Sequence, residues 1–506
     1  MASLPSGSPP PPGTALLDCR NVHAGLTISE VGGYYDGQSI VTVSDRVSLV
    51  FHHSHNHEGG AGLRLYHCSS VNNGLSWSVP TPVEKSLSQP SHDGYQFVHP
   101  ETKRIYLIYG YNDNQLHYVD GKTGKHVDLP RGDMQLEAGF RIKVSDDGGL
   151  SFGRERYDIP VRRTSIDREN PWKGSTMGAF HCDKPSVIGG SVYFAFQKTK
   201  EGGGETPESE VFFMRSKDLL SKDNPGEATW ETLPKGDVGL FWKSRLRLGE
   251  EPHIFQVDPR DPASLMCLWR TEVGIIACCF SADGGETFTD PAPMTYDGER
   301  IMKNPRGSLT PHRFPDGSIL LIYYNNGHTE KEGYCGRRYY WYTYGRPALG
   351  HPNKMLWSEP ELALWWDGES LDDRPDWNAD WAIVDGPGYC DFAALPGGEL
   401  AFVESNKLTL RLHKVDPATL QHMSLQHLTS SPPSSPPSSS FRRPRGLGRT
   451  MMMPSLQGRS GGWSFVLRIG GLPSDVKPKT VICDSREIVT AAEDEEDGGC
   501  YITKGF

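Results

Sequence analysis

The sequence lacks a long apolar run and an excess of positive charge. No stretch of about 18 apolar residues occurs, so the sequence offers no candidate membrane span. Asp and Glu total 63 against 52 for Lys and Arg, which gives a net charge of -11. A surface that binds nucleic acid needs basic side chains to neutralise phosphates, so this balance argues against that class of protein.

Paired cysteines and a recognisable secretion signal are also missing. Ten cysteines are scattered without CxxC pairs, and Cys278 and Cys279 are adjacent, which favours buried thiols over a disulfide framework. The N-terminal sequence MASLPSGSPPPPGTALLDC has neither the basic start nor the apolar core of a signal peptide. As written, the chain is not expected to be secreted, although a different start could add such a signal, so the compartment stays open.

What the chain does contain is turn residues and a repeated hairpin. With 56 Gly and 39 Pro, it is typical of an all-β protein with many turns. Six times, an apolar run meets a tight turn and a second apolar run follows, as in strand–turn–strand units. Each unit recurs with enough chain for a four-stranded blade, so we expect a six-bladed β-propeller. The six hairpins span residues 36–53, 93–111, 183–197, 251–270, 306–324 and 389–404.

A second repeat has the pattern S-x-D-x-G-x-[ST]-[FW]. Residues 145–152 and 281–288 fit it, and residues 70–77 fit with Asn72 in place of Asp. The carboxylate can accept backbone N–H bonds in a turn, and Gly supplies the positive φ. The pattern resembles the Asp box of sialidases and other propellers, which implies a structural role for these acidic residues.

Composition divides the chain into four segments. Residues 1–18 are predicted to be a disordered N-terminal segment, and 19–427 to form the propeller. Its last strand, within 408–416, is expected to pair with a strand near 19–28 and close the ring. Residues 428–450 read as a Ser/Pro-rich linker, and 451–506 resemble the truncated start of a laminin-G-like or concanavalin-like jelly roll.

Hairpin geometry predicts which side chains share one rim. In an antiparallel hairpin the start of the first strand and the end of the second lie at the same edge. Many ionisable groups on this rim suit binding and cleavage of an anionic sugar. The rim comprises Tyr34, Tyr35, Asp36, His53, His55, His57, Glu58, Asp93, Asn112, His181, Asp183, Gln197, Glu251, Arg270, Arg306, Asn325, Asn326, His328, Tyr389, Asp391 and Glu404.

Four rim or near-rim residues carry a resemblance to the sialidase (neuraminidase) family. Glu251 and Arg270 resemble the Glu that opens a blade and the Arg that closes the same hairpin. Arg338, ahead of the WSEP segment 357–360, resembles a further Arg, and Tyr389 in GPGYCDF resembles the family's Tyr. The resemblance implies that Tyr389 is the nucleophile, Glu251 its base, and Arg270 and Arg338 the groups that bind the substrate carboxylate. A neutral Tyr avoids repulsion from that carboxylate, which a guanidinium can bind through two parallel hydrogen bonds.

The chain departs from the family pattern in its first blade. Where sialidases open with an Arg, this chain has GGYY at 32–35, so a third carboxylate-binding Arg is missing unless Arg306 reaches across. The usual general-acid Asp is also absent, and the segment HHSHNHE at 52–58 stands there. We expect Glu58 to donate the proton, with a histidine as the alternative donor. Solvated-loop and metal-binding readings of this segment stay open, and no metal or cofactor is predicted. Further substrate contacts are predicted at His57, Asp93 and Asp391.

The leading hypothesis is a sialidase-like exo-glycoside hydrolase that releases a terminal acidic sugar from a glycan or glycoconjugate, acting as a monomer. One alternative is a propeller polysaccharide lyase, in which His or Tyr abstracts the proton beside a uronate carboxylate. The other is a non-catalytic glycan- or protein-binding propeller. A lyase product absorbs in the ultraviolet, and a binder shows affinity without turnover.

Overall fold

The computed structural model divides into two compact units, residues 1–432 and 433–506. In the second unit, β29 (Ser464–Phe465) pairs antiparallel with β30 (Val481–Ile482). The jelly roll expected over 451–506 otherwise falls outside the described residues, and the four segment boundaries stay predictions. The structure describes residues 19–29, 34–54, 63–85, 91–113, 137–170, 172–200, 208–243, 247–297, 299–327, 339–348, 351, 354–365, 388–405, 407, 409–429, 464–465 and 481–482.

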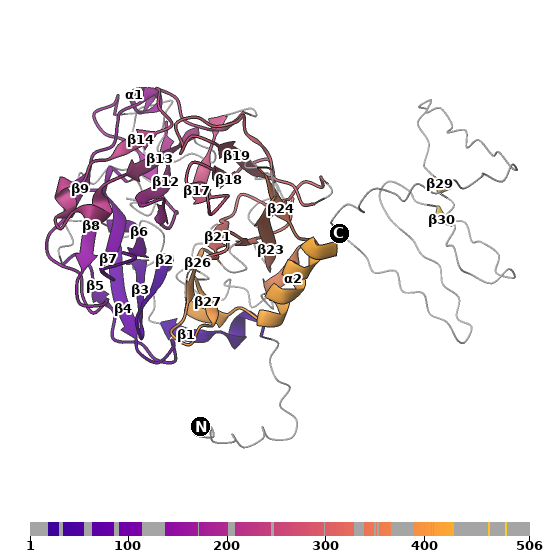
Figure 1. Cartoon of the computed structure of the whole chain (residues 1–506), viewed down its shortest axis with the longest axis horizontal. Coiled ribbons are helices and arrows are strands. Elements are labelled where there is room, and N and C mark those ends of the chain that lie inside the picture. Colours follow the sequence, from indigo (N-terminus) through magenta and orange to yellow (C-terminus); the bar gives the residue numbers. More distant parts are fainter. Residues whose placement is uncertain are drawn as a thin grey trace, which may run out of the picture. The chain divides into compact units, whose positions relative to one another are not determined.

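The first unit is the predicted six-bladed β-propeller, and every predicted hairpin contributes to a blade (Figure 1). Strands within each blade are antiparallel and mostly consecutive in the chain, so short turns suffice to connect them. Blades one to three contain β2 (Tyr34–Val43), β3 (Arg46–Ser54), β4 (Arg64–Ser70) and β5 (Thr81–Pro82); β6 (Ser91–Val98), β7 (Ile105–Tyr111), β8 (Gly139–Ser145) and β9 (Tyr157–Ile159); and β10 (Ala179–Phe180), β11 (Ser186–Ile188), β12 (Ser191–Thr199), β13 (Ser209–Ser216) and β14 (Glu231–Leu233).

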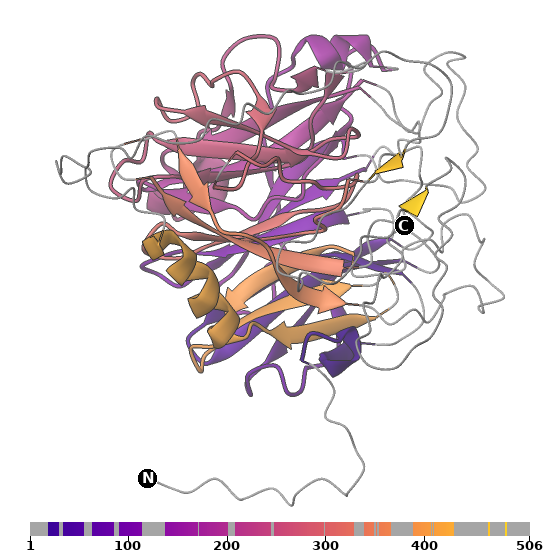
Figure 2. The same cartoon turned by 90° about the vertical axis from the view of Figure 1, so that its right-hand side faces the viewer.

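The remaining blades follow in order around the ring, and Figure 2 shows their strands from the side. A small two-stranded sheet, β15 (Trp242–Lys243) with β16 (Arg247–Leu248), precedes blade four. Blades four to six contain β17 (Glu250–Gln256), β18 (Leu265–Arg270), β19 (Ile276–Ser281) and β20 (Ala292–Pro293); β21 (Thr310–Arg313), β22 (Ile319–Tyr323), β23 (Tyr339–Pro347), β24 (Met355–Trp357) and β25 (Glu361–Trp365); and β26 (Cys390–Ala394), β27 (Leu400–Ser405) and β28 (Leu410–Lys414).

An N-terminal strand completes the last blade, as the sequence predicts. Strand β1 (Leu26–Ser29) pairs antiparallel with β28, placing Leu26 opposite Leu412. Val22, just before β1, is fully buried in a cluster with Tyr342 and Phe402. The ring is therefore closed by hydrogen bonds between the two ends of the propeller segment, which removes an open sheet edge.

The three S-x-D-x-G turns share one hydrogen-bond pattern. In the turn after β8, Ser145 Oγ lies 2.7 Å from Asp147 Oδ1, which accepts the Ser151 N–H at 3.0 Å. Asp283 and Asn72 accept from Thr287 and Ser76 in the same way, each at 3.0 Å. Glycines of positive φ, Gly74, Gly149 and Gly285, donate their N–H to the first serine of each turn. The turns thus hold the outer hairpins by side chain–backbone bonds.

The apolar core lies largely between neighbouring blades. One cluster joins Phe97 and Phe140 of the second blade to Phe194 and Phe212 of the third. The rings of Phe140 and Phe194 meet edge to face at 5.4 Å, a favoured arrangement for aromatic pairs. Each blade is therefore fixed by the faces of its neighbours as well as by its own strands.

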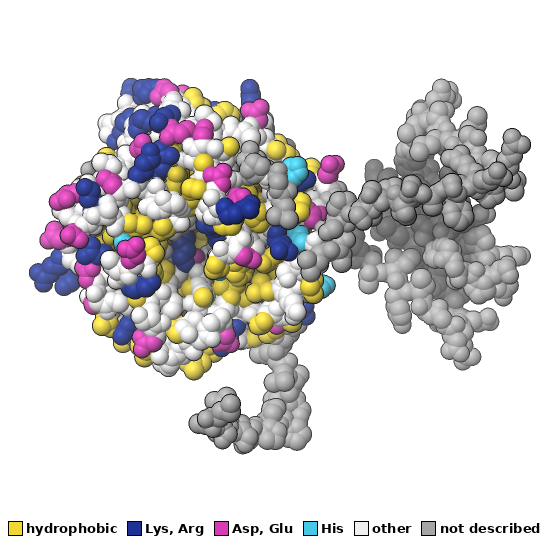
Figure 3. Space-filling model, in the orientation of Figure 1, with side chains coloured by type: hydrophobic (Ala, Val, Ile, Leu, Met, Phe, Trp, Pro, Cys, Tyr) yellow, Lys and Arg dark blue, Asp and Glu magenta, His cyan; other side chains and the backbone are white. Residues whose placement is uncertain are grey.

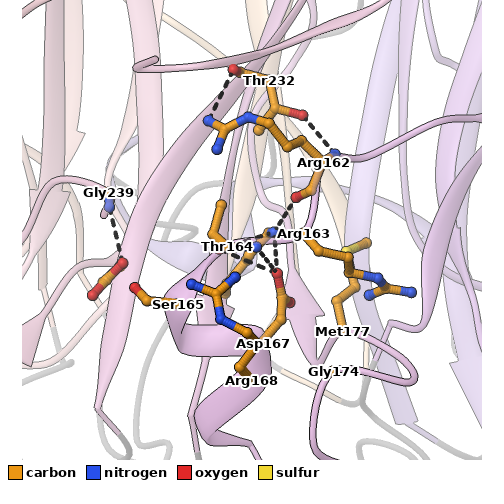
Figure 4. Close-up of polar contacts among 12 residues, drawn as sticks. Arg162, Arg163, Thr164, Ser165, Asp167, Arg168, Gly174, Met177, Thr232 and Gly239 are labelled. Carbon is orange, nitrogen blue, oxygen red and sulfur yellow. Dashed lines mark hydrogen bonds and ion pairs between the residues drawn. The ribbon is translucent and has the colours of Figure 1, made fainter. Parts of the chain in front are cut away.

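A buried ion pair attaches the short helix α1 (Ser165–Glu169) to blade three (Figure 4). Asp167 Oδ2 accepts the Thr164 N–H at 2.8 Å and lies 2.5 Å from Nζ of the fully buried Lys198 on β12. Lys198 also donates to the Arg162 carbonyl at 2.7 Å, so its charge is paired and hydrogen-bonded, as buried charges require. Helix α2 (Pro417–Thr429) follows β28 and contacts β23.

The inner strands surround a central cavity of about 360 Å³. Most of its lining is apolar, and the space-filling view shows hydrophobic side chains around the hollow at the centre of the ring (Figure 3). No helix within the described ranges is long and apolar enough to span a membrane.

Candidate active site

Two adjacent glutamates open blade four, and their side chains contact different sets of groups that share only Arg270. The ladder between β17 and β18 shifts between Glu250 and His253, and Glu251 adopts a positive φ of 48°. Such an irregularity changes the direction of successive side chains. The Gln197 amide oxygen accepts the Glu251 N–H at 2.6 Å, which fixes this backbone against blade three. Both glutamates are buried, 2% and 7% exposed, yet each carboxylate reaches a different set of groups.

Glu251 connects Tyr389 to Arg270. The Tyr389 hydroxyl donates to Glu251 Oε1, while Arg270 Nη1 lies 2.9 Å from Glu251 Oε2. A carboxylate in contact with a phenol is placed to accept its proton, and the guanidinium stabilises that carboxylate. The three residues predicted as nucleophile, base and carboxylate binder are therefore in direct contact.

The backbone ahead of Tyr389 is fixed by hydroxyl groups of blade five. The Gly388 carbonyl accepts hydrogen bonds from Ser308 Oγ at 3.0 Å and Tyr324 OH at 2.9 Å, and from Tyr340 OH as well. Gly388 has no room for a side chain, because an added Cβ would lie 2.6 Å from the Ser405 carbonyl oxygen. These contacts fix the backbone immediately before Tyr389 and thereby set the direction of the Tyr389 side chain.

Glu250 contacts a second arginine, Arg306, and holds its guanidinium beside that of Arg270. Arg306 donates through Nε and Nη2 to the two Glu250 oxygens at 2.9 and 2.8 Å, and Arg270 Nε lies 3.1 Å from Oε2. Burial alone would raise the pKa of Glu250, but Arg306 and Arg270 lower it to about 2. The side chains of Arg306 and Arg270 are 14% and 11% exposed, so they remain open to a ligand in part. Arg306 thus reaches the site, as one reading of the sequence required.

The rim of blades one and two carries a separate acidic group. Asp93, at a positive φ of 24°, lies 3.2 Å from His52 Nδ1 through Oδ1, and its side chain is 17% exposed. Burial raises the pKa of the Cys182 thiol, and the charges of Glu251 and Asp93 raise it further. Asp93 and Glu251 therefore both lie within electrostatic range of the Cys182 thiol.

Other predicted site residues are located differently or fall outside the described ranges. Asp391 lines the central cavity. Its Oδ2 accepts hydrogen bonds from the Ile40 N–H and from the Lys184 ammonium, each at 2.8 Å. Its side chain is 4% exposed, so these contacts occupy it. The predicted residues that lie outside the described ranges are His55, His57, Glu58, His328 and Arg338.

The sequence reasoning missed two charged residues at this site. Glu250 has no distinguishing sequence signal beside Glu251, because the direction of its side chain depends on the irregular ladder between β17 and β18. Lys407 follows β27, and its Nζ lies 4.5 Å from the centre of the Tyr389 ring while it pairs with Asp36. No sequence pattern marked Lys407, because its position depends on the turn between two strands.

The ring of six blades and its rim define a propeller of the kind seen in sialidase structures. The NanB sialidase from Streptococcus pneumoniae aligns with a TM-score of 0.51 at 12% identity, covering 80% of this chain and 72% of that one. The intramolecular trans-sialidase from Ruminococcus gnavus gives 0.51 at 14% identity, with 80% and 99% covered. A protein of unknown function from Dyadobacter fermentans gives 0.50 at 12%, with 78% and 97% covered. No family model and no curated protein matches the sequence, so the likeness concerns the fold.

Proposed function

We propose that the chain is a sialidase-like exo-glycoside hydrolase that removes a terminal acidic sugar, sialic acid or a related sugar, from glycans. The contact chain Tyr389–Glu251–Arg270 is the observation that carries this proposal. It combines a phenol nucleophile, a base in contact with the phenol, and a guanidinium suited to a carboxylate. The sialidase-type fold supports the proposal by analogy alone.

In the proposed reaction, the acidic sugar binds with its carboxylate toward Arg270, Arg306 and Arg338. The Tyr389 oxygen forms a bond to the anomeric carbon while the phenol proton passes to Glu251. The bond from that carbon to the leaving oxygen breaks, and Glu58 protonates the oxygen. Water then attacks the same carbon and gives its proton to Glu58, which returns to its acid form. The bond from the carbon to the Tyr389 oxygen breaks, and Tyr389 regains its proton from Glu251.

The test is turnover of a fluorogenic sialic acid conjugate by the full chain and by Tyr389→Phe. Removing the nucleophilic oxygen should lower kcat/KM about 1000-fold, because no covalent intermediate can form. Tyr339→Phe is the matched control, since Tyr339 is 44% exposed and should keep its full rate. Release of fluorophore without the ultraviolet absorbance of an unsaturated sugar product excludes a lyase reaction.

Absence of turnover by folded wild-type protein on sialosides and on other acidic glycosides would contradict the proposal. Turnover that survives in Tyr389→Phe would contradict the assigned nucleophile. A rise in ultraviolet absorbance with a uronate polysaccharide would point instead to lyase chemistry.

A further inference from the structure

Lys407 occupies a strained position between β27 and β28, the two middle strands of the last blade. It follows β27 and has a positive φ of 72°, a conformation that costs energy for a residue with a side chain. Its carbonyl accepts the Tyr35 N–H at 2.9 Å, and its own N–H donates to Ser405 Oγ at 3.2 Å. Ser405 Oγ in turn donates to the Tyr35 carbonyl at 2.7 Å, so blade one holds this turn in place.

The turn places the ammonium of Lys407 beside the ring of Tyr389. Nζ pairs with Asp36 Oδ2 and lies 4.5 Å from the centre of the Tyr389 ring and 5.1 Å from that of Tyr34. The residue is 5% exposed. Burial lowers the pKa of Lys407 well below its usual range, and Asp36 supplies the counter-charge that an ammonium needs in such a place.

The opposite charges at the junction of blades one and six come from different blades. Blade one offers an acid, Asp36, and no Lys or Arg occurs in residues 30–36. The last blade offers the cation instead. We propose that Lys407 is a positioning residue for Tyr389. The Lys407 ammonium supplies from the last blade the positive charge that residues 30–36 of blade one lack. This inference rests on the role of Tyr389 in the proposed function.

A cation at this distance has a definite chemical effect on a phenol. When Tyr389 loses its proton to Glu251, the negative charge moves from the carboxylate, beside Arg270, to the phenolate oxygen. Arg270 balances the charge while it is on Glu251, and Lys407, 4.5 Å from the centre of the Tyr389 ring, balances it once it is on the phenolate. Since the charge is fixed in a site with little water, it stabilises the phenolate without reorganisation.

The test uses the phenol itself and needs no sugar. Benzenesulfonyl fluoride is added to the full chain, and the labelling rate of each tyrosine is measured by peptide mass spectrometry. The Tyr389 oxygen bonds to sulfur, the S–F bond breaks, fluoride leaves, and the phenol proton passes to Glu251. Lys407→Met should slow the labelling of Tyr389 about tenfold relative to Tyr339 in the same digest. Lys407→Arg should restore most of the rate.

Matched variants separate this role from a structural one. Lys414→Met removes an exposed lysine that pairs with Glu399 and should leave the rate unchanged. The double variant Asp36→Asn, Lys407→Met leaves no unpaired buried charge, and it should be as slow as Lys407→Met.

Equal labelling of Tyr389 in the wild type and in the double variant would overturn the inference. A chain that shows the labelling pattern but hydrolyses no acidic glycoside would contradict the proposed function and leave the role of Lys407 intact.

Discussion

At the scale of single residues, the Glu250 carboxylate compensates the positive charges of two arginines at the site. Its carboxylate lies between Arg270 and Arg306, which lower its pKa to about 2 against the opposing effect of burial. An unfolded chain binds this proton near pH 4.3. Because the folded pKa is the lower one, the stabilisation is fully present above about pH 4.5 and is lost as the pH falls toward 2.

Glu250→Gln is therefore expected to lower the free energy of unfolding by roughly 3 kcal/mol at pH 7. The difference from the wild type should shrink between pH 4.5 and 2, where the wild-type carboxylate becomes protonated. Urea unfolding at several pH values measures both effects. Glu399→Gln is the control, because Glu399 is 48% exposed and its pair with Lys414 should contribute at most about 1 kcal/mol. Equal pH profiles for wild type and Glu250→Gln would contradict the assignment.

The same scale shows what a sequence can and cannot predict. Glu251, Arg270 and Tyr389 could be predicted to share a rim, because hairpin geometry places strand starts and strand ends at one edge. Glu250 and Lys407 could not, since their directions depend on an irregular ladder and on a left-handed turn. Tertiary packing sets both features, and neither leaves a local pattern.

At the scale of elements, the turn around Asp147 should stabilise its hairpin measurably. Burial would raise the pKa of Asp147, but its bonds to Ser151 lower it to about 2, which shows how strongly the turn favours the charged form. Asp147→Ala removes acceptors for the Leu150 and Ser151 N–H groups and should cost about 2 kcal/mol of unfolding free energy. Chemical denaturation measures this cost.

Asp147→Asn is the matched variant for this turn. Asn72 makes the corresponding bond to the Ser76 N–H in blade one, so an amide oxygen can serve as the acceptor. The Asn variant should lose less stability than the Ala variant. Equal losses would show that the carboxylate charge, and not the acceptor geometry, matters in this turn.

The fold itself was predictable to the level of blades and ring closure. Six hairpins and three turn repeats predict the number of blades and their order, because each depends on neighbouring residues. The pairing of β1 with β28 was also predictable, since a ring with one incomplete blade needs a strand from the other terminus. Helix α1 and its buried pair with Lys198 were not predicted, because a five-residue helix has little periodicity to detect.

At the scale of the whole molecule, removal of residues 1–29 should destabilise the propeller cooperatively. The deletion removes β1 and the buried Val22, and it leaves β28 as an unpaired edge. We expect a Tm lower by several degrees and a tendency to self-associate, measured by thermal unfolding and size-exclusion chromatography. The control removes residues 1–18 only and should match the full chain. An unchanged Tm after the longer deletion would show that closure of the ring contributes no stability.

Ring closure also sets an order of events during synthesis. Leu26 leaves the ribosome early, but its partner Leu412 is made near the end of the propeller segment. At roughly 5–20 residues per second, the N-terminal strand waits about 20–80 s for its partner. Throughout that time a nascent chain with several finished blades carries an unsatisfied β-strand at its start. Chaperones that bind extended segments would meet this strand first, and its release would have to be timed to the arrival of the last blade.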